Sequence, residues 1–228
     1  MSHPLPILLG LLCATSVAQA APVEEQRNVG GFQRIRVEGS IDVRVSPGTV
    51  RATLQGEPAA VRQVLTELDG DTLVIRQTEA YPRRGAEVVV QIQAPGLSAL
   101  DLKGSGDVQL KDFKLPALAL RVAGSGDLQA QAITVGRLEI KVAGSGDVRL
   151  SGRCEQATVA VAGSGDVAAA DLSCREVSVS VAGSGNADVH ASEQLTASVA
   201  GSGDVRYRGR PAQVQRREAG SGRVSAAD

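Results

Sequence analysis

Aromatic and histidine side chains are scarce in this 228-residue sequence, which has two Phe, two Tyr and no Trp. Proteins that bind nucleobases or sugars by stacking use aromatic rings, so this sequence has few means for that mode of binding. The only histidines are His3, near the N-terminus, and His190, which excludes a metal site with several histidine ligands. The formal net charge of −1 removes the electrostatic argument for nucleic acid as a partner.

Long hydrophobic runs are also missing, apart from residues 5–18. This run is shorter than the span of about 20 residues that a transmembrane helix needs, and Ala18-Gln19-Ala20 resembles a signal-peptide cleavage site. We therefore predict a signal peptide over 1–20, no membrane span, and an exported protein in the periplasm, at the cell surface or secreted. Bulky Leu12 before Cys13 argues against a lipid anchor at that cysteine.

Glycine is abundant, with 26 residues, and much of it belongs to an internal repeat. Gly-Ser-Gly begins at residues 104, 124, 144, 163, 183, 201 and 220. Five copies continue with aspartate, namely Asp107, Asp127, Asp147, Asp166 and Asp204. The segment Gly39-Ser40-Ile41-Asp42-Val43 is a degenerate further copy. A repeat of about 20 residues is typical of solenoids, because one unit cannot bury its own apolar face and must stack on its neighbours.

Apolar and polar residues alternate on both sides of each Gly-Ser-Gly corner. One unit has Leu138, Ile140 and Val142 before its corner, and Val148 and Leu150 after it. This alternation indicates short strands with one buried face, and glycine suits a corner where coils approach closely. We predict an all-β protein, a right-handed parallel β-solenoid with coils of about 20 residues. Calcium-binding nonapeptide repeats, hexapeptide helices and leucine-rich repeats fit the pattern less well.

Residues 21–100 follow the repeat less cleanly, and we expect them to cap one end of the solenoid of residues 101–228, with which they are continuous. Strands are predicted at 32–37, 41–45, 50–55, 72–77, 87–93 and 100–103. Glu57 to Leu65 is predicted to form a short helix with proline in its first turn. Such a cap would cover the edge strands of the stack.

Two cysteines test the register of this prediction. Cys154 and Cys174 each lie nine residues before a Gly-Ser-Gly corner. Stacking on adjacent coils places their Cα atoms about 4.8 Å apart, a separation that a disulfide accepts. We therefore predict a Cys154–Cys174 disulfide in the exported chain, with two buried, reduced cysteines as the alternative.

The succession of these segments resembles a known family. It runs through Phe32-Gln-Arg-Ile35-Arg-Val37, Gly39-Ser40-Ile41-Asp42-Val43, Gly56-Glu57, Leu73-Val74-Ile75 and the Gly-Ser-Gly-Asp-Val units. In this order it is similar to the head-GIN-domain family over about residues 32–225. That family is a bacterial exported domain of unknown function with an adhesin label. The resemblance implies a β-solenoid in the cell envelope or outside the cell, and it implies no catalytic residues.

The aspartates that follow the corners are one candidate site. Stacked coils would align Asp107, Asp127, Asp147, Asp166 and Asp204 in a row of carboxylates, which calcium prefers as ligands. The alternative is that each aspartate accepts a backbone N–H in its own turn. One carboxylate per coil supplies few ligands for a calcium ion. We therefore favour the interpretation that each aspartate accepts a backbone N–H, and we predict no metal or cofactor.

The C-terminal unit supplies a second candidate, since it is rich in arginine. Arg206, Arg208, Arg210, Arg216 and Arg217 form a candidate patch for an anionic polymer, because arginine recognises carboxylates and phosphates. The alternative, which we favour, is a charged cap that stops further coils from stacking on the end.

Together these features favour a non-enzymatic exported solenoid that interacts, in the manner of an adhesin, with the envelope or the cell surface. The partner would be an envelope polysaccharide or another envelope protein. One alternative is an enzyme acting on polysaccharide, although the sequence has no distinctive pair of acids outside the repeat. Another is a structural accessory protein that docks on another envelope protein.

Overall fold

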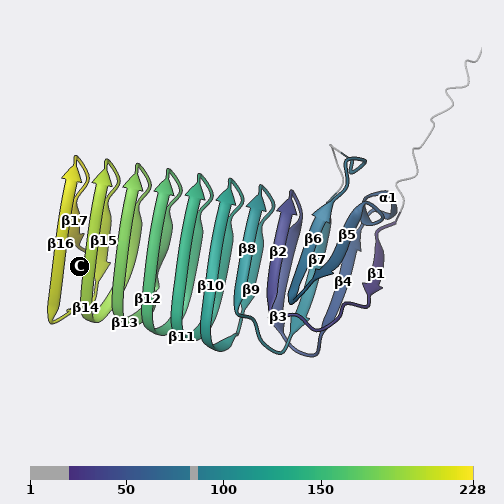
Figure 1. The fold of residues 1–228 in the computed structure, drawn as a ribbon, viewed down its shortest axis with the longest axis horizontal. Coiled ribbons are helices and arrows are strands. Elements are labelled where there is room, and N and C mark those ends of the chain that lie inside the picture. The colour runs from purple at the N-terminus through teal and green to yellow at the C-terminus, as the bar shows by residue number, and fades with distance from the viewer. Residues whose placement is uncertain (1–20, 83–86, 228) are drawn as a thin grey trace, which may run out of the picture.

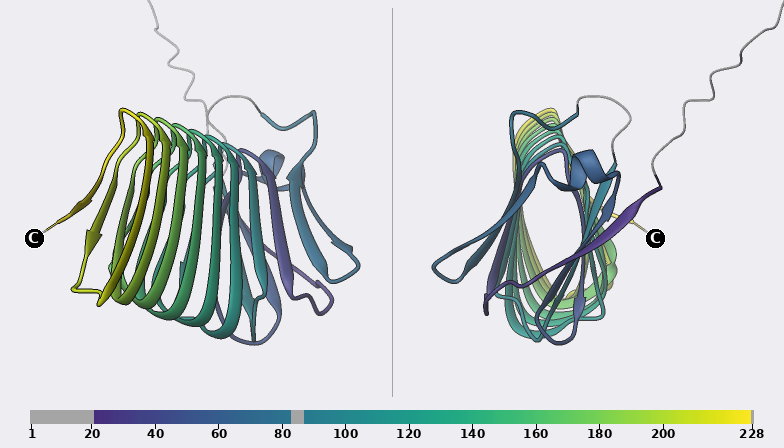
Figure 2. Two further views of the ribbon diagram at one scale, coloured as in Figure 1. Left: turned by 60° about the vertical axis from the view of Figure 1, so that its left-hand side comes forward. Right: turned by 90° about the vertical axis from the view of Figure 1, so that its right-hand side faces the viewer.

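The computed structural model describes residues 21–82 and 87–227, which form a parallel β-solenoid with coils that wind in a right-handed sense (Figure 1). The predicted signal peptide lies outside the described residues. Each coil is flattened, so the solenoid has two broad faces joined by the Gly-Ser-Gly corners along one edge (Figure 2). The all-β solenoid fold is thereby confirmed. Within the described residues, no helix is long and apolar enough to cross a membrane.

The strands that follow the corners form one face, which we call the aspartate face. Its spatial order is β1 (Val23–Arg27), β4 (Arg51–Gly56), β7 (Val88–Ala94), β3 (Asp42–Pro47), β9 (Val108–Lys111), the first parts of β11 (Leu128–Gly144), β12 (Val148–Gly163), β13 (Val167–Gly183) and β14 (Ala187–Gly201), then β15 (Val205–Arg208) and β17 (Val224–Ala226).

The strands that precede the corners form the opposite face. In space these are β5 (Val64–Asp69), β6 (Thr72–Gln77), β2 (Arg34–Gly39), β8 (Ala99–Gly104), β10 (Lys114–Gly124), the second parts of β11 to β14, and β16 (Gln213–Gly220). All pairs are parallel except β1–β4, β4–β7 and β5–β6 at the N-terminal end.

The core lies between the two faces and consists of stacked columns of aliphatic side chains. Leu120, Ile140 and Val159 are paired in register on successive coils, and each is at most 2% exposed. Because the same inward position recurs in every coil, the alternation in the sequence becomes a continuous buried column. The core therefore needs few aromatic rings, and Phe113 is its largest fully buried side chain among the described residues.

The corners require glycine because adjacent coils touch there through their backbones. Gly144 has a φ of +133°, and a Cβ on it would lie 2.3 Å from the carbonyl oxygen of Gly124. A Cβ on Gly146 would lie 2.2 Å from the carbonyl oxygen of Gly126. The N–H groups of Ser145 and Gly146 both donate to the Gly124 oxygen, at 2.9 and 3.1 Å. The close approach therefore satisfies the backbone of the turn.

The N-terminal part inserts one coil and extends the solenoid at its end. Gly39 pairs with Gly104, so β2 and β3 form a coil in register with the repeat, as the degenerate copy predicted. The chain then passes through β4, α1 (Pro58–Val61), β5, β6 and β7 at the far end before β8 stacks on the other side of β2. The antiparallel strands β1, β4 and β5 extend the two faces at this end of the solenoid (Figure 1).

Two local predictions in this segment differ from the structure. The helix begins at Pro58, with Glu57 as its N-cap, and it ends at Val61, not Leu65. Val64 starts strand β5, where it is fully buried and pairs with Gln77, because the antiparallel partner β6 outweighs the weak helical spacing. Strand β1 was not predicted, since its short and mostly exposed sequence has no alternating apolar pattern.

Candidate functional site

The structure contains the predicted disulfide. Cys154 and Cys174 are paired in register on β12 and β13, their Cα atoms lie 4.5 Å apart, and their sulfur atoms are bonded. Both are buried in the core. The bond therefore joins two adjacent coils from inside and is a structural feature, remote from the outer surface.

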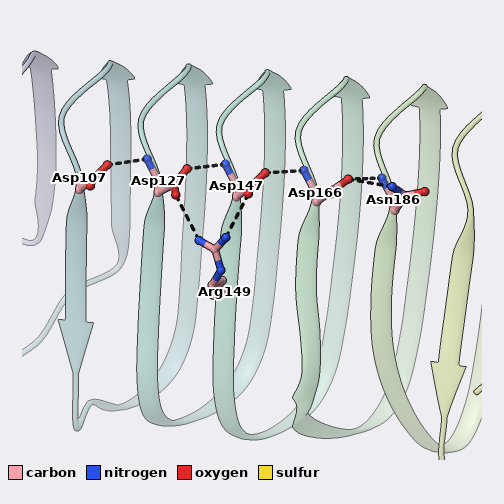
Figure 3. Close-up of polar contacts among 6 residues, drawn as sticks. All are labelled: Asp107, Asp127, Asp147, Arg149, Asp166 and Asn186. Atoms are coloured by element: carbon pink, nitrogen blue, oxygen red, sulfur yellow. Dashed lines mark hydrogen bonds and ion pairs between the residues drawn. The ribbon is translucent and has the colours of Figure 1, made fainter. Parts of the chain in front are cut away.

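The repeated aspartates form a ladder just after the corners, which Figure 3 shows in part. Oδ1 of Asp107 accepts the backbone N–H of Asp127 at 3.0 Å, and Oδ1 of Asp127 accepts that of Asp147 at 3.0 Å. The pattern continues along the solenoid through Asp166, Asn186 and Asp204 to the N–H of Arg223, and it begins at Asp42. Each acceptor thus serves the next coil, and the expectation of a bond within its own turn is wrong.

The ladder accounts for these aspartates without a cation. Arg149 also bridges the outer oxygens of Asp127 and Asp147, at 3.1 and 3.2 Å (Figure 3). Asn186 occupies one position and still accepts the N–H of Asp204, so a carboxylate charge is not needed for the bond. Across the described ranges, no group of three or more His, Cys, Asp or Glu residues is placed to hold a metal. That the row binds no metal stays a prediction.

The C-terminal arginines do not form a single patch. Arg206 and Arg208 lie on β15 of the aspartate face, whereas Arg217 lies on β16 of the opposite face. Arg210 lies between these two strands in the chain. The candidate patch predicted from the sequence is therefore divided between the two sides of the solenoid.

Arg216 takes part in a cap on the last coil. Arg216 pairs with Ala197 and Glu218 pairs with Val199, so each occupies an inward column that is apolar and buried in earlier coils. Arg216 donates to the carbonyl oxygen of Val224 at 3.3 Å, and Glu218 accepts the N–H of Val224 at 2.7 Å. Two charged side chains thus reach toward β17 across the end of the core, an arrangement suited to capping.

A recess lies elsewhere in the described part of the chain, on the N-terminal half of the aspartate face. It has a volume of about 570 Å³ and opens on the outer side of β1, β4, β7, β3 and β9. Arg44, Arg51 and Lys111 line it and are exposed. Within the described residues none of these three cations makes an ion pair or a side-chain hydrogen bond. Glu24 is the only acid among the described residues that line the recess. We call this site the N-terminal recess.

Uncharged amides accompany the cations of the N-terminal recess. Gln91, Gln93 and Gln109 line it, together with Ser46 and Thr53. The strand register extends this lining into a row that crosses six strands, from Thr53 through Gln91, Arg44, Gln109 and Gln129 to Arg149. Lys111 and Gln131 pair in a second row beside it. We call these the glutamine rows.

Sequence reasoning missed this site because its residues are scattered from Glu24 to Lys111 and share no motif. The pattern that could have indicated it is the outward-facing polar residue of each strand, compared between strands that are neighbours in space. The spatial order of the strands is not the chain order, since β7 lies between β4 and β3.

Shifted pKa values occur outside the recess. The hydrogen bond from Arg175 lowers the pKa of Glu193, and Glu193 and Glu155 raise the pKa of Arg175. The hydrogen bond from Lys141 lowers the pKa of Glu139, and burial raises the pKa of Tyr81. The shifts of Glu193 and Arg175 come from ion pairs between exposed side chains of neighbouring coils, so they do not mark a catalytic acid or base.

Comparison with known proteins agrees with this architecture. Residues 31–211 match the family described as "Putative auto-transporter adhesin, head GIN domain". A crystal structure of a "putative adhesin" from Bacteroides fragilis is 22% identical with a TM-score of 0.85, covering 91% of this chain and 97% of that one. Another, from Parabacteroides distasonis, is 24% identical with a TM-score of 0.76, covering 91% and 98%. A "putative lipid binding protein" from the same species is 24% identical with a TM-score of 0.72, covering 91% and 97%. No curated protein matches the sequence.

Proposed function

The chain belongs to the head GIN domain family, and from this premise we propose that it is an exported, non-enzymatic solenoid that binds a component of the cell envelope or cell surface. The N-terminal recess is the observation that carries the proposal. It is a concave surface on a rigid stack of strands, and its three cations have no ion-pair partner in the described residues. A rigid scaffold that holds unpaired charges around a recess is suited to binding.

The chemistry of the recess favours binding over catalysis. Glycoside hydrolysis by the usual route needs two carboxyl groups on either side of the bond that is cut. The N-terminal recess has Glu24 alone, and Gln55 donates a hydrogen bond to that glutamate at 3.3 Å. The aspartate ladder supplies carboxylates in number, but each ladder aspartate holds the backbone of the next coil. These observations support a binding protein over the alternative of a polysaccharide-acting enzyme.

Co-sedimentation tests the proposal. Protein produced from the full-length gene is mixed with insoluble cell-envelope material over a series of salt concentrations, and the bound fraction is measured. We expect retention that falls as salt rises, because unpaired surface cations act through screened electrostatic attraction. Absence of retention at every salt concentration would contradict the proposal. A soluble protein that co-purifies in a fixed ratio would instead support the accessory role.

A further inference from the structure

We propose that the N-terminal recess and the glutamine rows bind an acidic glycan, a chain of hydroxylated sugars in which some units carry a carboxylate. This inference rests on the proposed function and names the class of its ligand. It is carried by the side chains that converge on the recess, by the register that extends them across the strands, and by the charges that border them.

The cations give the recess its preference for a carboxylate. Arg44 and Arg51 come from neighbouring segments of the chain but from strands separated by β7, and Lys111 comes from β9 on the other side of β3. All three are exposed, so they are free to contact a ligand. The planar guanidinium binds a carboxylate through two parallel hydrogen bonds, and lysine adds a point charge.

The glutamines suit the hydroxyl groups of sugars. A primary amide offers both donors and an acceptor, so it pairs with a hydroxyl in either role. Nε2 of Gln91 donates to Oε1 of Gln55 at 2.8 Å, which fixes the orientation of that amide. The side chains of Gln93, Gln109 and Gln129 make no hydrogen bond within the described residues. They are therefore available along the surface.

The geometry of the rows fits an extended chain. The row from Thr53 to Arg149 crosses six strands that are paired in register. Adjacent strands lie about 4.8 Å apart, so the row is about 24 Å long and runs along the solenoid axis. A second recess of about 250 Å³, lined in part by Gln129, Gln131 and Arg149, continues the surface toward the C-terminus. A glycan of several units can contact the rows along this length.

The surroundings of the recess argue against ligands with a higher charge density and against apolar ligands. The aspartate ladder runs beside the central row, since Asp42 lies two residues before Arg44 on β3 and Asp107 directly precedes β9, two residues before Gln109. A polymer with a charge on every unit, such as a nucleic acid, would lie against this acidic border, and the described residues that line the recess include no aromatic ring for a base. The large exposed apolar side chains of the described residues, Val23, Val50 and Leu68, do not line it, so it also lacks the apolar anchors of a protein interface.

The test uses defined oligosaccharides and two matched triple variants. The probe is a hyaluronan oligosaccharide, in which glucuronate alternates with N-acetylglucosamine, and the neutral reference is a chito-oligosaccharide of equal length. The recess variant is Arg44→Gln/Arg51→Gln/Lys111→Gln. The control variant, Lys103→Gln/Arg137→Gln/Arg153→Gln, removes the same charge from exposed cations of the opposite face. Affinity is measured by titration calorimetry, and circular dichroism checks the fold of each protein.

We expect the wild type and the control variant to bind the acidic oligosaccharide in preference to the neutral one. The recess variant should lose about tenfold or more in affinity, because charge-assisted hydrogen bonds are lost. Equal affinity of the recess variant and the wild type would overturn the assignment, as would equal binding of the neutral reference or no binding of the acidic one.

The same proteins in the envelope co-sedimentation assay separate this inference from the proposed function. If the wild type and the recess variant are retained equally, the envelope-binding function stands and the ligand assignment fails. If the wild type is not retained at any salt concentration, both fail.

Discussion

The second glycine of each Gly-Ser-Gly corner gives the sharpest test of the packing argument, and Gly146→Ala is the substitution of choice. The new Cβ would lie 2.2 Å from the carbonyl oxygen of Gly126, well inside van der Waals contact. Relief requires the two coils to separate at the corner. That separation breaks the hydrogen bonds from Ser145 and Gly146 to Gly124 and from the Asp147 N–H to Asp127, which measure 2.9, 3.1 and 3.0 Å. At about 1 kcal/mol for each bond, the substitution should lower the free energy of unfolding by about 3 kcal/mol.

Urea unfolding followed by circular dichroism measures this change. The control is Gly31→Ala, because a Cβ at Gly31 meets no atom within 4 Å and its φ lies outside the left-handed region. The control should match the wild type or gain up to about 1 kcal/mol through the reduced entropy of its unfolded chain. If Gly146→Ala unfolds within about 0.5 kcal/mol of the wild type, the coils can separate at little cost and the steric account of the repeat is refuted.

Four further predictions follow from single features of the fold. Asp147→Asn should unfold like the wild type in urea, as the natural Asn186 implies, whereas Asp147→Ala should lose about 1 kcal/mol; equal stability of the two variants would contradict the ladder. Reduction of the disulfide, or Cys154→Ala, removes a covalent cross-link between residues 20 apart in sequence. The free energy of unfolding should fall by about 3 kcal/mol, measured by unfolding with and without reductant. Joint substitution of Arg216 and Glu218 by leucine should produce end-to-end assembly in analytical ultracentrifugation, and a monomer at every concentration would contradict the cap. The lowered pKa of Glu139 makes its ion pair stabilising above the ordinary glutamate value of about 4.3, and that contribution disappears as the pH falls through the lower folded value. Melting temperatures of Glu139→Gln and the wild type should therefore differ slightly at about pH 6 and converge as the pH falls below the folded value.

The coil repeat could be predicted from the sequence because its residues are repeated for a physical reason. Each Gly-Ser-Gly corner needs glycine where the next coil touches it, and each inward position needs an aliphatic side chain. These requirements return with every coil, so their spacing reports the register directly. The same logic placed Cys154 beside Cys174 and identified the coil at Gly39.

The N-terminal recess could not be predicted in this way, because the strands that build it are not neighbours in the chain. After β3 the chain passes to the far end of the solenoid and returns, which brings Gln91 between Thr53 and Arg44. None of these residues differs from an ordinary exposed residue in the sequence. The arginine-rich C-terminal segment showed the converse, since Arg208 and Arg217 are close in sequence but lie on strands of opposite faces.

These two outcomes have a common cause in how a solenoid divides its residues. Inward and corner positions are constrained by stacking and must repeat, whereas outward positions are free to vary from coil to coil. Information about a ligand can therefore reside only in the outward rows, and it is richest where the coils depart from the repeat. In this protein that departure is the inserted coil of β2 and β3 with its neighbours, where Arg44 meets Gln91 and Gln109 across the strands. The regular coils supply rigidity through the aspartate ladder, and the irregular ones supply the chemistry of the recess.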